Sequence, residues 1–334
     1  MWRRVTPEND RFVGSNGSFS GVTRVGWGPR RLGDVTTQAE ALAQLSGLTV
    51  LKGHGTGNDF VLVPDPDAAL DLTAAQVRAL CDRHAGLGAD GVLRVVPTAS
   101  SPEVADQAGR ARWFMDYRNS DGSLAEMCGN GARVFARYLV DAGLETGSEF
   151  SIATRGGTRG VRIEHDGDVT VDMGTATSPV VRAMPVVRVG DRSWNGSGVL
   201  VPNPHCVVLL DDADALRELD LTRAPDVAPP AVFPDGVNVE FVVRVGAPDE
   251  RHVAMRVHER GVGETLSCGT GACAVMVAVA ASDDAPRHAA YTVDVPGGTV
   301  VVTRLEDGRL ELRGPAVLVA TATIAAAPIP VTAG

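Results

Sequence analysis

The sequence contains the pattern Cys-Gly-x-Gly-Ala twice, beginning at Cys128 and at Cys268. In each copy the cysteine stands directly before an apolar, alanine-rich segment, and the two glycines allow the backbone to turn tightly. This order predicts a helix with a cysteine at its N-terminus, where unpaired N–H groups and the helix dipole favour negative charge. We therefore expect both thiols to ionise more easily than a free cysteine.

A longer repeat surrounds the two motifs. Aligning the two cysteines also places Asn119 on Glu259, and a nearly equal offset places Asn58 on Asn203. A repeat of about half the chain is too long for a solenoid, and it predicts two similar domains that face each other. We expect a mixed α/β (α+β) fold in which each domain wraps a mostly antiparallel or mixed sheet around a central α-helix. The active site is expected in the cleft between the domains, with the two cysteines on opposite walls.

The repeat also suggests boundaries. We expect an N-terminal extension over 1–47 that is poorly ordered apart from a short helix over 37–45, a first domain over 48–178 and a second domain from 179 to 315. Apolar runs and turn residues predict a Gly-rich loop over 53–59, a Thr-capped helix over 73–83 and a helix from Cys128 to about residue 140. Strands are expected over 48–52, 60–63, 91–96, 112–118, 150–154, 160–165 and 169–172.

Composition excludes several classes of protein. A chain of 334 residues with 44% hydrophobic content is typical of globular domains. The net charge of −10 and the lack of clustered Lys and Arg argue against a nucleic-acid partner. No apolar run is long enough to span a bilayer and no signal-peptide pattern opens the chain, so we expect no membrane partner and a cytoplasmic location.

The five cysteines are an odd number and form no Cys-x-x-Cys pair, which argues against a disulfide framework or a zinc ribbon. We predict no metal site, and we expect Cys81, Cys206 and Cys273 to be inert core residues. Lys52 is the only lysine and hence the only candidate for a pyridoxal phosphate Schiff base. No Gly-x-Gly-x-x-Gly or P-loop pattern follows the Gly-x-Gly elements, which argues against a nucleotide site.

Two activated thiols on opposite sides of one pocket predict a particular reaction. A thiolate on one face of a small carbon acid can take the Cα proton while a thiol on the other face delivers one, which inverts the centre. The backbone N–H groups of Gly129, Asn130, Gly269 and Thr270 can hold the substrate carboxylate and the charge that develops on it. The sequence therefore predicts a two-base racemase or epimerase.

Four segments together resemble the diaminopimelate epimerase family from about residue 48 to the end of the chain. They are His54-Gly-Thr-Gly-Asn-Asp-Phe60, Met127-Cys-Gly-Asn-Gly-Ala-Arg133, Pro202-Asn-Pro-His-Cys206 and the Gly-rich run from Glu259 to Cys273. The resemblance implies a cofactor-independent interconversion of LL- and meso-2,6-diaminopimelate, which supplies lysine and peptidoglycan precursors. It also implies a homodimer and a final strand, at about 316–326, that returns to the first domain.

The resemblance assigns roles to single residues. It implies that Cys128 and Cys268 are the acid/base pair, and that His205 and Glu259 help to set their protonation. The residues that it implies for binding the distal amino-acid end of the substrate are Asn58, Asn119, Asn203, Asn238, Glu259 and Arg260.

Other functions stay open at this point. One is a proline-type racemase on the same doubled scaffold, although Asn130, Arg133 and the Glu259-Arg260 pair favour a longer, two-headed substrate. Others are an amino-acid-binding protein without activity and a thiol redox switch. If the two cysteines face each other, we expect them to form an inactivating disulfide on oxidation.

Overall fold

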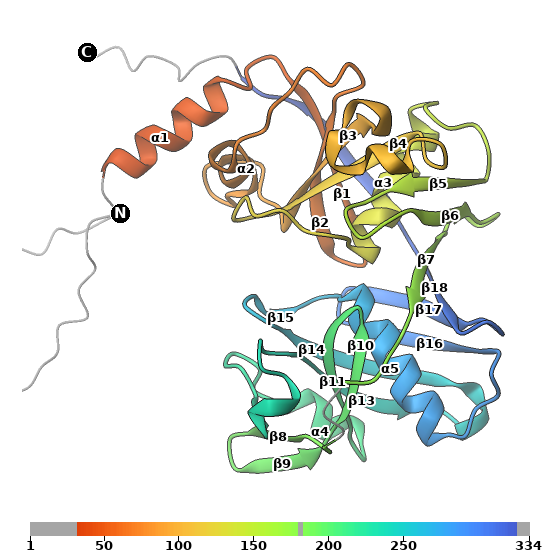
Figure 1. The fold of residues 1–334 in the computed structure, drawn as a ribbon. Helices are drawn as coiled ribbons and strands as arrows, with labels where there is room; N and C mark the ends of the chain where they lie inside the picture. The colour runs from red at the N-terminus through yellow and green to blue at the C-terminus, as the bar shows by residue number, and fades with distance from the viewer. Residues whose placement is uncertain (1–31, 180–182, 326–334) are drawn as a thin grey trace, which may run out of the picture.

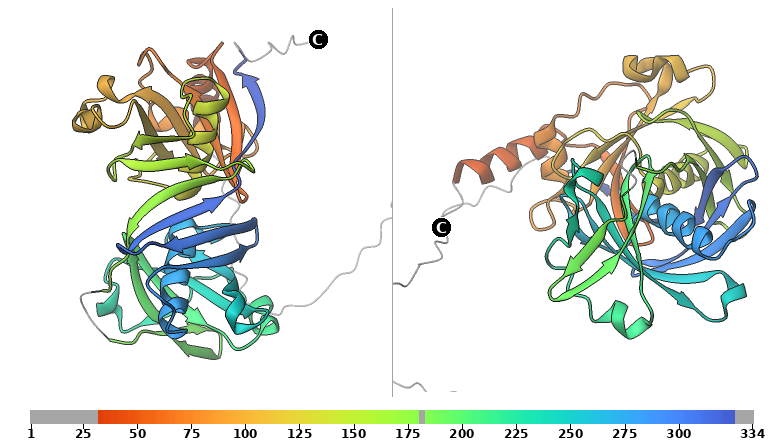
Figure 2. Two further views of the ribbon diagram at one scale, coloured as in Figure 1. Left: turned by 90° about the vertical axis from the view of Figure 1, so that its right-hand side faces the viewer. Right: turned by 60° about the horizontal axis from the view of Figure 1, so that its bottom comes forward.

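A single sheet of 16 strands runs through both lobes of the molecule in the computed structural model, which describes residues 32–179 and 183–325 (Figure 1). Its order is β10-β11-β13-β14-β16-β17-β18-β7-β6-β5-β4-β3-β2-β1-β19, with β15 paired to β14. We call β1–β7 with β19 the first lobe, and β8–β18 the second lobe. Each lobe bends its part of the sheet around one long helix, as the two further views show (Figure 2).

The elements of the first lobe are α1 (Leu32–Ala43), β1 (Thr49–Gly55), β2 (Asn58–Pro64), α2 (Ala74–Cys81), β3 (Gly91–Pro97), β4 (Trp113–Asn119), α3 (Gly129–Asp141), β5 (Glu149–Ala153), β6 (Arg159–Ile163), β7 (Val169–Thr175) and β19 (Val317–Thr323). Those of the second lobe are β8 (Val186–Val189), β9 (Arg192–Asn195), β10 (Ser197–Val201), β11 (Asn203–Leu209), α4 (Ala213–Arg217), β12 (Asp226–Ala228), β13 (Asn238–Val245), β14 (His252–Glu259), β15 (Gly263–Thr265), α5 (Gly269–Ser282), β16 (Ala289–Val295), β17 (Gly298–Arg304) and β18 (Arg309–Gly314).

The strand pairing repeats from one lobe to the other. The hairpin β1–β2 is followed by β3 parallel to β2, by β4 antiparallel to β3, and, after α3, by β5 parallel to β4. The hairpin β10–β11, the parallel β13, the antiparallel β14 and, after α5, the parallel β16 repeat this series. An antiparallel meander ends both series, β5-β6-β7 in one lobe and β16-β17-β18 in the other. The expected two-domain α/β fold around two central helices is confirmed.

Two strand pairs join the lobes. The strand β7 pairs antiparallel with β18, so the sheet continues from one lobe into the other. After β18 the chain crosses back, and β19 pairs antiparallel with β1 of the first lobe. The division at residue 178 stays our proposal for the domain boundary.

The central helices are buried on most faces. In α3 the residues from Gly129 to Ala136 are all buried, and α5 is apolar almost all round. A helix of this kind is stable only inside a core, which the surrounding strands of each lobe provide. Burial, and not the weak helix propensity of the two opening glycines, therefore holds these segments as helices.

The predicted loop over 53–59 is wrong in extent. The strand β1 runs to Gly55 and β2 begins at Asn58, which leaves a turn of Thr56 and Gly57 alone. Both residues have positive φ, +51° and +81°, as the short turns of β-hairpins require. The Thr73 side chain caps α2 and forms a capping box with Gln76, so this predicted cap is confirmed.

The helix expected over 37–45 corresponds to α1, which begins earlier, at Leu32, and packs on α2. Gln44 accepts a hydrogen bond from Gln76 of α2 at 3.1 Å. The expectation of poor order for residues 1–31 lies outside the described residues. No helix in the described parts of the chain is long and apolar enough to cross a membrane.

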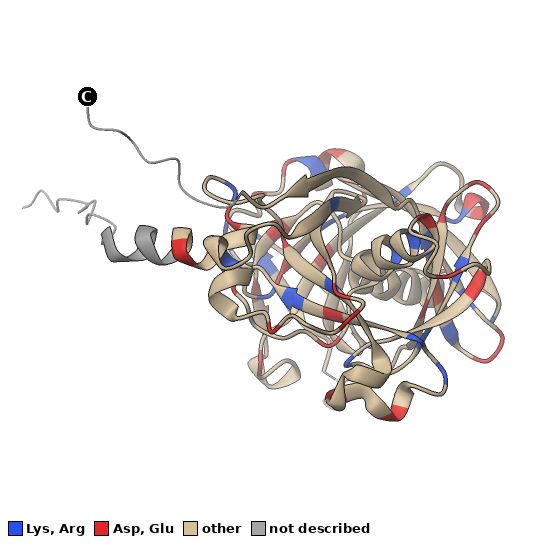
Figure 3. Ribbon diagram, turned by 90° about the horizontal axis from the view of Figure 1, so that it is seen from above, with Lys and Arg blue, Asp and Glu red and all other residues tan. Residues whose placement is uncertain are grey.

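Acidic and basic residues are scattered over both lobes of the ribbon (Figure 3). Many of them form ion pairs. The most buried aspartate among the described residues is Asp116 on β4, only 1% exposed, which faces three guanidinium groups. It pairs with Arg118 at 3.0 Å, with Arg155 at 2.6 Å and with Arg94 at 3.5 Å. Burial alone would raise the pKa of Asp116, but the hydrogen bonds from Arg118 and Arg155 outweigh it and lower this pKa.

We predict that Asp116→Asn lowers the free energy of unfolding by about 3 kcal/mol, because it leaves buried guanidinium groups without their shared carboxylate. The pKa of Asp116 is lowered in the folded state. The contribution of its carboxylate to the free energy of unfolding is therefore present above about pH 4 and is lost as the pH falls further. The difference between wild type and variant should therefore shrink in acid. Urea unfolding between pH 3 and 7 measures this, with the exposed Asp67→Asn as control; equal stabilities at neutral pH would contradict the prediction.

Candidate active site

Each of the two motif cysteines is the N-cap residue of a central helix. Cys128 precedes α3 and Cys268 precedes α5, both with extended backbone. Their Sγ atoms accept hydrogen bonds from the N–H groups of Gly131 and Gly271 at 3.4 and 3.3 Å. Helix geometry leaves the N–H groups of the first two helical residues, the Gly-Asn and Gly-Thr pairs, without an acceptor inside the helix. Two equivalent groups of donors thus surround two equivalent thiols.

The two helices contact each other at these N-termini. A Cβ atom added at Gly269 would lie 3.5 Å from Cα of Gly129 and 2.9 Å from Cδ2 of Leu312. A Cβ atom added at Gly129 would meet the same leucine at 2.9 Å. A side chain at either position would have to displace the end of Leu312, so the motif glycines suit the place where the two cysteine loops lie next to each other across the lobe boundary.

The expected acidity of the thiols is wrong. Burial raises the pKa of Cys128 to about 11, although the Gly131 N–H group lowers it; the charge of Glu259 raises it further. Burial also raises the pKa of Cys268 well above its ordinary value, as do the carboxylates of Glu259 and Glu240. The helix N-termini do favour the thiolates, but desolvation at the lobe boundary is the larger effect. All five cysteines are free thiols.

Amide side chains surround Cys128. The thiol donates to Oδ1 of Asn58 at 3.7 Å, and Asn130 donates to the same oxygen at 3.2 Å. The Nδ2 group of Asn58 donates in turn to Asp90 at 2.7 Å, which fixes the orientation of the amide. The side chain of Asn119, at the end of β4, donates to Ser123 instead.

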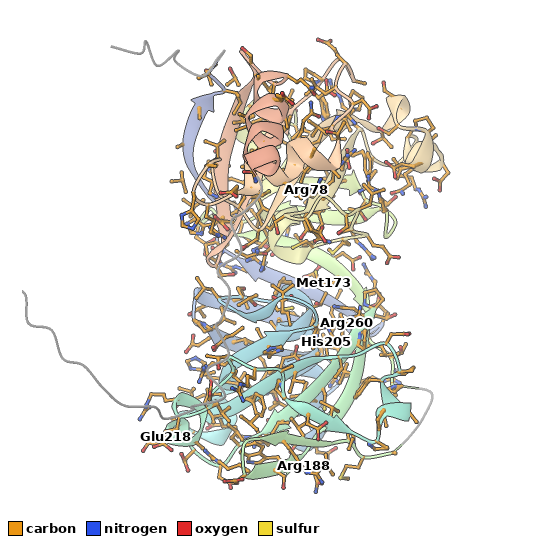
Figure 4. All side chains as sticks on the ribbon, turned by 90° about the vertical axis from the view of Figure 1, so that its left-hand side faces the viewer. Arg78, Met173, Arg188, His205, Glu218 and Arg260 are labelled. Carbon is orange, nitrogen blue, oxygen red and sulfur yellow. The ribbon has the colours of Figure 1, made fainter. Side chains whose placement is uncertain are left out.

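Charged and polar groups lie on the Cys268 side. His205 of β11 is fully buried between Oε1 of Glu240, 2.7 Å from Nδ1, and Oδ1 of Asn203, 3.0 Å from Nε2. Cys268 also contacts Oγ1 of Thr270 at 3.4 Å. Figure 4 places His205 in the part of the second lobe nearer the first lobe, whereas Arg188 and Glu218 lie at its far end.

The predicted pair Glu259 and Arg260 does not act as an ion pair. The Glu259 carboxylate accepts from Thr265, and burial raises the pKa of Glu259. Arg260 donates from its backbone N–H group to Asn238 at 2.8 Å and from Nη1 to the carbonyl of Asp235 at 2.9 Å. The two neighbours therefore point to different partners, with the carboxylate on the cysteine side and the guanidinium near the surface.

Three buried residues of this region were not predicted as site residues: Thr56, Glu240 and Ser267. Glu240 is fully buried on β13, and its Oε2 atom has no hydrogen-bond partner within the described residues. One sign of it was available, because a single carboxylate interrupts the apolar run Val239-Glu-Phe-Val-Val243. The two hydroxyls gave no such sign, since serine and threonine are common in turns. No set of three or more His, Cys, Asp and Glu side chains suited to a metal occurs in the described parts of the chain.

The fold belongs to a class of proteins built from two similar lobes, each with a curved sheet around one central helix. Solved structures that share it include a PhzF-family phenazine biosynthesis protein from Bacillus anthracis, with a TM-score of 0.58 at 16% identity, covering 82% of this chain and 98% of that one. A hydroxyproline epimerase from Agrobacterium vitis matches with a TM-score of 0.55 at 13% identity, covering 84% of this chain and 93% of its own. Identities this low show the fold alone.

Sequence comparison is more specific. The family model for diaminopimelate epimerase matches residues 50–179 and 199–319. A curated diaminopimelate epimerase from Streptomyces coelicolor is 57% identical over 278 residues, covering 82% of this chain and 94% of the relative. A diaminopimelate epimerase from Rhodococcus jostii is 49% identical over 285 residues, covering 82% of this chain and 96% of the relative. The chain belongs to the diaminopimelate epimerase family, and the resemblance noted in its sequence is confirmed.

We predict that Glu259→Gln makes both motif thiols easier to ionise, because it removes a negative charge that raises the pKa of each. The pH midpoint for labelling of Cys128 by iodoacetamide should lie near pH 11 in the wild type and closer to neutral pH in the variant. At about pH 8.5 the variant should be labelled roughly 3- to 10-fold faster than the wild type. Peptide mass spectrometry of labelled protein measures this for each cysteine. The exposed Glu306→Gln is the control, and unchanged midpoints in Glu259→Gln would refute the prediction.

Proposed function

We propose that this chain interconverts LL- and meso-2,6-diaminopimelate, a step that supplies lysine and peptidoglycan precursors, by moving the Cα proton between Cys128 and Cys268. The observation that carries the proposal is the contact of two cysteine-capped helices at their N-termini, one from each lobe. A substrate carbon held between the two thiols has a base on one face and an acid on the other. Inversion of the centre follows from this arrangement without a cofactor.

The first step is removal of the Cα proton by the thiolate of one cysteine. A thiolate whose conjugate acid has a raised pKa is a stronger base, which suits a weakly acidic C–H group. The electron pair of the broken C–H bond spreads into the α-carboxylate, which becomes enediolate-like. The free N–H groups of Gly129, Asn130, Gly269 and Thr270 then stabilise the added negative charge.

The second step delivers the thiol proton of the opposite cysteine to the other face of Cα. This leaves the cysteines with their protonation states exchanged, so each acts as base for one stereoisomer. Glu259 lies close enough to influence both thiols, and His205 with Glu240 lies on the Cys268 side. We assign to Glu259 and His205 the setting of the cysteine protonation states.

The distal amino-acid end of the substrate needs groups that recognise a carboxylate and an ammonium group. We assign this recognition to Asn58, Asn119, Asn203, Asn238, Glu259 and Arg260. Support comes from their positions at strand ends: Asn58 begins β2, Asn119 ends β4, Asn203 begins β11 and Asn238 begins β13. A guanidinium such as that of Arg260 suits a carboxylate through paired hydrogen bonds.

The assembly and location of the protein are further proposals that rest on family membership. We propose a homodimer in the cytoplasm, formed by protomers with domains over 48–178 and 179–315. Sedimentation velocity of the purified chain tests the dimer, and a species with the mass of one chain at all concentrations would exclude it.

Incubation in deuterated water tests the reaction. With LL-diaminopimelate we expect α-deuterium in the product and formation of the meso isomer, whereas L-proline should stay unlabelled. Chiral chromatography with mass spectrometry measures both. Exchange with proline alone would assign the chain to the proline-type racemases, and exchange with neither substrate would favour a binding protein.

We predict that Cys128→Ala and Cys268→Ala each lower the rate of epimerisation by at least about 10³-fold, because a positioned acid or base contributes roughly 10² to 10⁴ and inversion needs both. Cys81→Ala is the matched control, since this buried cysteine lies on α2. Circular dichroism should show all three variants folded. Substantial turnover in either active-site variant would rule out the two-base mechanism.

A further inference from the structure

The turn between β1 and β2 of the first lobe packs against the second lobe directly beside Cys268. A Cβ atom added at Gly297, in the β16–β17 turn, would lie 1.8 Å from the carbonyl oxygen of Thr56. One added at Gly57 would lie 3.0 Å from a side-chain carbon of Leu266, two residues before Cys268. The Gly297 N–H group donates to the Leu266 carbonyl, which holds this surface of the second lobe together. The hairpin turn is thus in close contact with the segment that leads into the Cys268 loop.

Hydrogen bonds connect four side chains at this contact in a ring that closes through the backbone of α3. The hydroxyls of Thr56 and Ser267 lie 2.6 Å apart, and Arg133 donates to the Thr56 hydroxyl at 3.2 Å. Asn130 donates to the hydroxyl of Ser267 at 3.3 Å and to its carbonyl at 3.1 Å. Because Asn130 and Arg133 stand one turn apart on α3, the ring closes on the helix and crosses the lobe boundary twice. We call these four residues the boundary ring.

All four side chains of the boundary ring are buried, and burial of such polar groups costs folding free energy. Its members are between 0% and 4% exposed. Arg133 forms no ion pair with a carboxylate within the described residues, and its Nη1 atom has no partner there. A buried guanidinium without a counter-ion is expensive, and burial lowers the pKa of Arg133 to about 10. Thr56 adds backbone strain, since a β-branched residue rarely adopts a φ of +51°.

We propose that the boundary ring positions Cys128 relative to Cys268, so that the thiols lie on opposite faces of one bound carbon atom. Two members of the ring, Asn130 and Ser267, lie next to the two cysteines. Asn130 donates to Oδ1 of Asn58, the oxygen that accepts from Cys128, and Ser267 is the residue before Cys268. The inference rests on the proposed function and adds three positioning residues to it: Thr56, Arg133 and Ser267.

Loosening the ring has a specific chemical consequence. After the thiolate takes the Cα proton in deuterated water, a deuteron reaches the carbon in one of two ways. Delivery by the opposite S–D group gives the inverted isomer, while exchange of the first thiol with solvent and return from the same face gives labelled substrate of unchanged configuration. Misplacing the opposite thiol slows inversion but not return of a deuteron from the same face. The ratio of deuterated product with retained configuration to deuterated product with inverted configuration therefore rises.

We predict that Ser267→Ala and Thr56→Val each raise this ratio by about tenfold or more, since a small misplacement of a reacting group costs up to roughly 10² in rate. Thr56→Ser, which keeps the hydroxyl, should retain the wild-type ratio. Thr154→Val is the matched control, because Thr154 is fully buried in the first lobe and its hydroxyl donates to Gly157 at 2.7 Å outside the ring. Wild-type ratios in both ring variants, or an equal rise in Thr154→Val, would overturn the proposal.

A second measurement does not depend on turnover. Amide hydrogen exchange followed by mass spectrometry should show faster exchange in Ser267→Ala for the peptides that contain 129–131 and 269–271, in both lobes together, and unchanged exchange in α2. Exchange that rises only around residue 267 would overturn the coupling between the loops. A wild-type protein that fails to epimerise diaminopimelate would instead overturn the proposed function, while this measurement would still decide whether the ring couples the two loops.

Discussion

The close approach of the N-termini of α3 and α5 is the contact on which the rest of the structure depends. Gly129 and Gly269 lie at this contact, and a side chain at either position would have to displace the buried end of Leu312. The helices that meet there are buried on most faces, so each requires its own curved sheet, and the β7–β18 pair makes those sheets continuous. The return of β19 to β1 closes the chain across the same boundary. Sheet, crossover and helix contact together hold two cysteines from distant parts of the chain beside one another.

This arrangement also determines the chemistry of the thiols. Helix N-termini usually lower the pKa of a cysteine, but here the helices end inside protein, and removal of water has the larger and opposite effect. Both thiols therefore have a raised pKa, and the thiolate formed from either of them is a strong base. A carbon acid needs a base of this strength. In the proposed reaction, the N–H groups of Gly129, Asn130, Gly269 and Thr270 stabilise the carboxylate that accepts the electron pair.

The sequence predicted the parts of this structure that depend on repetition and local pattern. It was possible to predict the two motifs, the matched asparagines and the Thr73 cap because their spacing reflects helix and strand geometry. The environment of the thiols and the role of Ser267 could not be predicted, and the apolar run around Glu240 marked that residue without indicating its partners. The thiols and Ser267 depend on what the other lobe places beside them. Ser267, for example, contacts Thr56 although 211 positions separate them, and spacing along the chain does not predict such a side-chain contact.

The two halves have diverged at the positions where the reaction makes different demands on them. Asn58 and Asn203 occupy matched strand starts, yet Asn58 accepts from the Cys128 thiol while Asn203 contacts His205, which pairs with the buried Glu240. The charge of Glu259 raises the pKa of both thiols, but Cys128 otherwise stands among neutral amides, whereas Cys268 also lies near the carboxylate of Glu240. A reaction that needs one thiolate and one thiol at the same moment gains from this difference, because two identical environments would give no preference for where the shared proton lies. The approximate symmetry supplies opposed bases, and its imperfection separates their protonation states.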